Sequence, residues 1–181
     1  MDVVAHGLWT MAAASGARTK VKRPISLGRA VFWGVFPDLF SFAIPAVVRL
    51  WWFATRTPHT LLPQAGDAQH FQFVWQLYNG SHSLLVFGLV FFATWSVLRR
   101  PVFELCGWML HIVIDIATHQ GMFAVQFLWP VSSYAVNGIR WENWWFMATN
   151  YVLLCGALGW MWLRSRKPES ELIHGTDAKK R

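Results

Sequence analysis

Three side chains that can bind a metal ion lie four residues apart in one apolar stretch of the chain: His111, Asp115 and His119. Four residues advance an α-helix by slightly more than one turn, so these side chains share one side of a predicted helix. An ionisable group at bilayer depth costs about 2.5–3.5 kcal/mol on insertion scales, so Asp115 needs a partner. A divalent metal ion suits both residue types, because it binds neutral imidazole nitrogen and carboxylate oxygen. Two core histidines hydrogen-bonded to Asp115 explain the same stretch without a metal ion.

Polar residues interrupt the apolar pattern at three other places. Asp38 follows Pro37 near the middle of an apolar segment, which predicts an interrupted helix, with Asp38 either a functional group or a cap on its second half. His82 follows a turn signal, and Ser81 can cap the membrane helix that begins there. His6 lies near the start of the chain, where an isolated histidine is usually solvated.

The predicted directions of the helices determine which of these groups can meet. The helix with His111 runs outward and the helix after His82 runs inward, so His82 and His119 share the outer level. From the helical rise, Asp115 lies about 6 Å deeper than His119, and His111 about 12 Å deeper. One rigid helix cannot bring both ends to one ion. Asp115 could bridge two ions about 3.5–4 Å apart, with Asp38 closing the deeper side.

The composition is that of a small integral membrane protein. Of 181 residues, 55% are hydrophobic and only 14% are charged, which is too apolar for an ordinary soluble domain. Crossing a bilayer takes about 17–25 residues, and the stretches that approach this length are Leu27–Leu50, Ser83–Leu98, Val102–Thr118 and Trp144–Leu163. The stretch from Met1 to Ala17 is a short fifth crossing or a helix lying partly in the membrane. We expect an all-α membrane-embedded bundle of four or five membrane helices over residues 1–163.

The net charge of +7 comes from basic clusters that flank the apolar stretches. This is a topological pattern and not the footprint of a nucleic-acid-binding protein. The positive-inside rule places the clusters around Arg23, Arg99 and Lys167 in the cytoplasm. We therefore expect a multi-pass protein of the inner (cytoplasmic) membrane, with residues 164–181 as a polar cytoplasmic tail.

The order of these motifs resembles the YdjM-like group of predicted membrane-bound metal-dependent hydrolases. The matching positions are His6, Pro37 with Asp38, Ser81–Ser83, His111 with Asp115 and His119, and the stretch from Phe127 to Ser132 with its Trp129 and Pro130. That group is distantly similar to zinc-dependent phospholipases C and related nucleases, helical proteins whose metals are held by scattered His and Asp. The resemblance implies one or two divalent ions, with zinc expected, and His119 as a further ligand or a proton carrier. The metal ligands that it implies are His6, Asp38, His82, His111 and Asp115.

Hydrolysis of an ester by metal-activated water is the function expected, with a phosphoester in a lipid-like or other amphiphilic substrate as first choice. Asp115 would bridge metals or orient the water, and His119 would act as an acid or base near the outer surface. Two other classes of protein stay open. One is a membrane subunit that holds a haem or a metal between facing helices. The other is a transporter or channel in which the same residues relay ions or protons.

Overall fold

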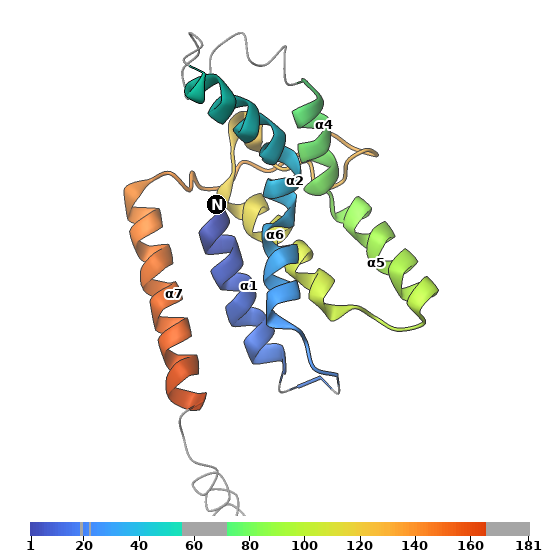
Figure 1. Ribbon diagram of the computed structural model, residues 1–181, viewed down its shortest axis with the longest axis vertical. Helices are drawn as coiled ribbons and strands as arrows, with labels where there is room; N and C mark the ends of the chain where they lie inside the picture. Colours follow the sequence, from blue (N-terminus) through green and yellow to red (C-terminus); the bar gives the residue numbers. More distant parts are fainter. Residues whose placement is uncertain (19, 22, 56–71, 166–181) are drawn as a thin grey trace, which may run out of the picture.

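The computed structural model describes residues 1–18, 20, 21, 23–55 and 72–165, and among these residues every regular element is a helix (Figure 1). The long helices are α1 (Val3–Arg18), α2 (Leu27–Ala54), α4 (Gln72–Ser81), α5 (Leu84–Leu98), α6 (Cys106–Thr118) and α7 (Trp144–Ser165), with 3-10 turns at η1 (Phe103–Leu105) and η2 (Gly121–Phe123). The all-α prediction is confirmed for this part of the chain. Most of the expected tail, from residue 166 onward, lies outside it.

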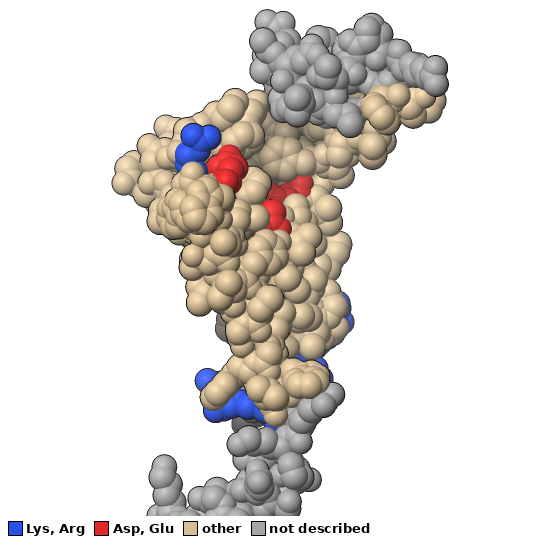
Figure 2. All heavy atoms as spheres, turned by 90° about the vertical axis from the view of Figure 1, so that its left-hand side faces the viewer, with Lys and Arg blue, Asp and Glu red and all other residues tan. Residues whose placement is uncertain are grey.

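Helix α2 is the centre of the arrangement, because it contacts α1, α4 and α6. Helix α7 packs against α1 on one side of this group, and α5 extends from α4 on the other (Figure 1). At the lower end of Figure 1, α1 ends, α2 begins and α7 ends. Figure 2 shows Lys and Arg side chains at this same end, as the distribution of the basic clusters predicts.

Two helices are long and apolar enough to cross a membrane, Leu27–Val48 within α2 and Trp144–Arg164 within α7. The bent pair of α4 and α5, which meet at 62°, makes a third if it counts as one broken span. This is fewer than the four or five crossings expected. The reason is length, because α1, α5 and α6 have only 16, 15 and 13 residues, less than the roughly 17–25 that span a bilayer. The protein is thus a membrane-associated helical protein with two or three candidate spans.

The prediction that Pro37 interrupts its helix is wrong. Helix α2 continues through both Pro37 and Pro45, so Asp38 lies inside a helix and does not cap one. The Ser41 hydroxyl donates a 2.8 Å hydrogen bond to the Pro37 carbonyl, and such a bond to the preceding turn often bends a helix. Figure 1 shows α2 changing direction near its middle, which is what a proline within a continuous helix produces.

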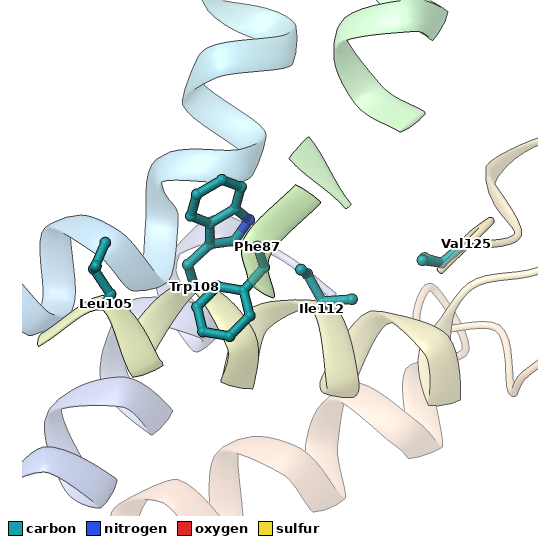
Figure 3. Packing of buried hydrophobic residues seen from close by; sticks show 5 residues of the cluster. All are labelled: Phe87, Leu105, Trp108, Ile112 and Val125. Atoms are coloured by element: carbon teal, nitrogen blue, oxygen red, sulfur yellow. The ribbon is translucent and has the colours of Figure 1, made fainter. Parts of the chain in front are cut away.

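One apolar core lies where α5 and α6 meet the segment after η2. Figure 3 shows its buried members Phe87, Leu105, Trp108, Ile112 and Val125. The Trp108 indole N–H also donates a 2.5 Å hydrogen bond to the Ser81 carbonyl. This core therefore holds α6 against the turn that carries His82.

Two glycines allow α1, α2 and α6 to cross closely. A Cβ added at Gly107 would lie 2.4 Å from the Ala30 carbonyl oxygen, and one added at Gly34 would lie 2.2 Å from Thr10 Oγ1. Real Cβ atoms do not approach other atoms so closely, so the helices can reach this separation only with glycine at these positions.

Gly107→Ala is therefore expected to lower the free energy of unfolding by about 1–3 kcal/mol, because its methyl group meets the backbone of α2. Thermal unfolding in detergent would measure the change. Gly156→Ala in α7 is the matched control, since a Cβ there meets nothing within 4 Å. Equal unfolding temperatures for the two variants would contradict the close crossing.

The segment between α6 and α7 is mostly irregular but is fixed to the end of α6 by backbone hydrogen bonds. Gly138 N–H donates to the His119 carbonyl at 2.8 Å, and Ile139 N–H donates to the Ala117 carbonyl at 2.9 Å. A Cβ at Gly138 would lie 2.3 Å from the Ala117 carbonyl oxygen. This close approach places the segment directly over the end of α6 that carries Asp115.

Candidate metal centre

Four of the residues that the sequence singles out converge on one point: Asp38, His82, His111 and Asp115. One ligand atom from each lies within 4.8 Å of those of the other three. They come from the middle of α2, the turn between α4 and α5, and α6. Both imidazoles and Asp115 are fully buried, and Asp38 is partly buried. A buried His/Asp group of this kind could bind a metal ion.

The turn between α4 and α5 places His82. We predicted that Ser81 would cap the following helix, but Ser83 does so, by accepting hydrogen bonds of 3.2 Å from the backbone N–H groups of Leu85 and Val86. The cap lies two residues later than predicted, so His82 precedes the first turn of α5. Its side chain therefore points into the bundle from the bend between two helices.

Backbone carbonyls determine which nitrogen of each imidazole carries a proton. His82 Nδ1 lies 3.0 Å from the Tyr78 carbonyl oxygen, and His111 Nδ1 lies 2.7 Å from the Gly34 carbonyl oxygen. A carbonyl can only accept, so Nδ1 is the donor in both rings. In a neutral imidazole, Nε2 then presents a lone pair, which is the form that binds a metal ion.

The two Nε2 atoms face each other at 3.1 Å. Two lone pairs at this distance repel unless a cation lies between them or one ring becomes an imidazolium. The other separations around the point are 3.1 and 3.5 Å from Asp115 Oδ2 to His111 and His82 Nε2, and 3.7 Å from Asp38 Oδ1 to each Nε2. Ligands about 2.0–2.1 Å from a tetrahedral ion lie about 3.4 Å apart. The donor set therefore fits one small divalent ion.

The second carboxylate oxygen of Asp115 faces a different group. Its Oδ1 lies 2.9 Å from His6 Nε2, 3.1 Å from His119 Nδ1 and 2.6 Å from the amino nitrogen of Met1. His6 is fully buried and stacks on His111 at 3.7 Å between ring centroids. The interpretation of His6 as a solvated terminal residue is therefore wrong. Asp115 lies between two sets of imidazoles, one on each oxygen.

Several of these atoms lack a hydrogen bond despite their short distances. Within the described residues, both ring nitrogens of His6, Nδ1 of His119 and Oδ2 of Asp115 are buried without a hydrogen-bond partner. The nitrogens therefore approach the carboxylate at angles that a hydrogen bond does not favour. Buried polar atoms are rarely left in this state, and a cation at the Asp38, His82, His111 and Asp115 group would satisfy Asp115 Oδ2.

His119 lies just beyond α6, which ends at Thr118. The prediction that His111, Asp115 and His119 all lie on one helix thus holds for the first two only. The backbone at His119 is extended, yet its ring still lies beside Asp115. His119 also lines the walls of two cavities, whereas His111 is fully enclosed.

The first cavity has a volume of about 470 Å³ and reaches Asp38, Tyr78 and His119, with mainly apolar side chains of α2 along one wall. The second has a volume of about 570 Å³ and is lined by polar side chains that include Gln120, Asn137 and Arg140. His119 belongs to both walls. A molecule could therefore reach the His/Asp group from either side of His119.

Sequence reasoning missed two residues that position the imidazoles. Tyr78 stacks on His82 at 4.0 Å and supplies its acceptor carbonyl, while its own hydroxyl donates to the Phe123 carbonyl at 2.8 Å. The four-residue spacing of Tyr78 and His82 in one helical segment is a signal that could have found this contact. No sequence signal could have found the contact with the Gly34 carbonyl, because every residue has a backbone carbonyl.

Comparisons of the chain with models of protein families, with curated proteins and with solved structures find no match. The resemblance to the YdjM-like hydrolases therefore stays a prediction, which rests on the order of the sequence motifs alone. The fold and the site define a class only: a helical, membrane-associated protein with a buried His/Asp group that could hold a metal ion.

Proposed function

We propose that this protein is a membrane-bound metal-dependent hydrolase of the YdjM-like type, acting on an ester or phosphoester of an amphiphilic substrate. The observation that carries the proposal is the pair of imidazole Nε2 atoms 3.1 Å apart, with Nδ1 of each ring bonded to a carbonyl. Two carboxylates complete the set, so the site favours a divalent cation in both charge and ligand type. Zinc is the first candidate.

The hydrogen bonds that hold the two histidines in place also support a metal site. Outer hydrogen bonds to backbone carbonyls fix the ring orientation of metal-binding histidines in general, and both His82 and His111 have such a bond. Asp38 is the ligand with the longest separations and also lines the apolar cavity. A substrate in the cavity could therefore reach the proposed metal ion most directly at Asp38.

A bound divalent ion would supply an activated water and would polarise the attacked ester. The protein supplies the rest. Asp115 orients the groups on both of its oxygens, and His119 lies where it can take up or release a proton at the junction of the two cavities. His6 and His119 lie 2.9 and 3.1 Å from the second oxygen of Asp115, so they are the candidate ligands of a second ion and the expected number is one or two.

Metal analysis together with an activity assay tests the proposal. The purified protein, loaded with zinc and washed, should contain one or two equivalents by mass spectrometry and should hydrolyse a chromogenic ester or phosphodiester. Metal bound in stoichiometric amounts without hydrolysis of either substrate would contradict the hydrolase but retain the metal site. Sub-stoichiometric metal would favour a hydrogen-bonded His/Asp relay with one ring as an imidazolium.

The alternative of a haem-binding subunit has no support in the site. The facing Nε2 atoms are 3.1 Å apart, which leaves no room for a flat macrocycle between them. The absorption spectrum checks this, because bound haem would give a Soret band.

We also propose that the basic end of the molecule faces the cytoplasm, as the positive-inside rule predicts. With Cys106 and Cys155 replaced by alanine, a thiol introduced at Lys167 should react only after the membrane is made permeable. A thiol introduced at Ser132, in the segment between α6 and α7, is the matched probe and should react from outside. Labelling in the reverse order would invert the topology.

A further inference from the structure

The cavity beside Asp38 has one wall that follows a single face of α2. Leu39, Phe42, Ala43 and Ala46 line it, and their spacing of three and four residues is that of one helix face. From Asp38 to Ala46 this face extends about 12 Å along the helix axis. The wall belongs to the segment of α2 that is long and apolar enough to cross a membrane. An apolar chain could therefore lie along it with one end at the metal ligands.

The cavity on the other side of His119 has the opposite character. Thr118, Gln120, Asn137 and Arg140 give it hydroxyl, amide and guanidinium groups. The two cavities share the walls formed by His119, Phe123, Trp141 and Glu142. An apolar space and a polar space thus meet beside the His/Asp group, as a ligand with an apolar part and a polar part requires.

We infer that the apolar face of α2 from Leu39 to Ala46 binds one hydrocarbon chain of a membrane lipid, whose head group lies in the polar cavity beyond His119. The ester linkage between chain and head group is then placed at Asp38 and His119. This role for the linkage rests on the proposed hydrolase function, whereas binding of the chain does not. The small side chains of Ala43 and Ala46 leave the space that the chain fills.

Photolabelling tests the chain site without any hydrolysis. The probe is a phosphatidylcholine that carries a diazirine at the end of one acyl chain, added to vesicles of unlabelled phosphatidylcholine that contain the chelator-treated protein. Label mapped by mass spectrometry should concentrate on the Leu39–Ala46 face of α2. Ala46→Trp should reduce this label about tenfold, the factor given by roughly 1.4 kcal/mol of lost binding free energy.

Ala93→Trp in α5 is the matched control, because Ala93 is exposed in another apolar helix and its substitution should leave the label on α2 unchanged. Phe42→Ala enlarges the cavity and should keep the label there, which covers the case in which Ala46→Trp does not fold. Label spread evenly over α2, α5 and α7 and unaffected by Ala46→Trp would overturn the inference. Concentrated label in a protein that binds no metal would retain the lipid site and overturn the hydrolase.

Discussion

Asp115→Asn is expected to remove the bound divalent ion and to reduce hydrolysis by more than a hundredfold, while the protein still inserts and folds. The amide keeps the volume of the carboxylate but loses the charge that both sets of imidazoles face at 2.9–3.5 Å. Loss of an outer-sphere partner alone costs about 10–100-fold in metal affinity or activity, and loss of a ligand should cost more. The amide lowers the cost of placing this helix in the membrane. It also removes the charge that pairs with the buried Met1 amino group at 2.6 Å, so the unfolding temperature should fall although the protein still folds.

Metal content and thermal unfolding would be measured on the same samples, with His111→Ala as a second probe of the same ion. Glu104→Gln is the matched control, because Glu104 is a carboxylate that pairs with Arg29 at 2.9 Å and does not belong to the His/Asp group. The control should keep its metal. Metal content that is equal in all four proteins would remove the metal site and favour a hydrogen-bonding role for Asp115 in the core.

Removal of the ion by a chelator is expected to destabilise the wild-type protein markedly. Without a cation, the Asp38 carboxylate and Asp115 Oδ2 lie beside two imidazole lone pairs. The Met1 amino group, on Asp115 Oδ1, offsets only one of the two negative charges, and an uncompensated buried charge is strongly destabilising. A ligand present at a thousand times its Kd stabilises the native state by about 4.1 kcal/mol. The unfolding temperature should therefore fall by several degrees on chelation and recover when zinc is returned.

The double variant His82→Ala/His111→Ala provides the control for this experiment, because it lacks both imidazole ligands. Its unfolding temperature should not respond to the chelator or to zinc. If wild type and double variant responded alike, the stabilising ion would be bound elsewhere in the protein.

The sequence predicts the members of the His/Asp group better than it predicts the helices that hold them. The four-residue spacing of His111 and Asp115 indicates a shared helix face, because this relation is local. The all-α class follows from the length and apolar character of the segments. The meeting of Asp38 with His82 is different, because it depends on how α2 packs against α4 and on the bend before α5. The motif order suggested this contact, but no spacing within one helix determines it.

The errors have physical reasons. Pro37 was expected to interrupt its helix, since proline removes one backbone donor, but α2 tolerates it by bending. Four or five crossings were expected from apolar composition, yet α5 and α6 are too short. Composition measures how apolar a stretch is, while the length of the helix depends on where the chain turns. His6 became part of the site through packing of α1 on its neighbours, which its local sequence does not show.

The hydrogen bonds between the irregular segment and the end of α6 have a consequence for how the site can be reached. Gly138 and Ile139 are bonded to the carbonyls of His119 and Ala117, so moving this segment away from α6 would leave buried backbone groups without partners. A Cβ at Gly138 would overlap the Ala117 carbonyl, which shows how closely the two parts of the chain pack. A molecule that reaches the buried carboxylates must therefore enter through the two cavities that meet at His119, while this segment stays in place.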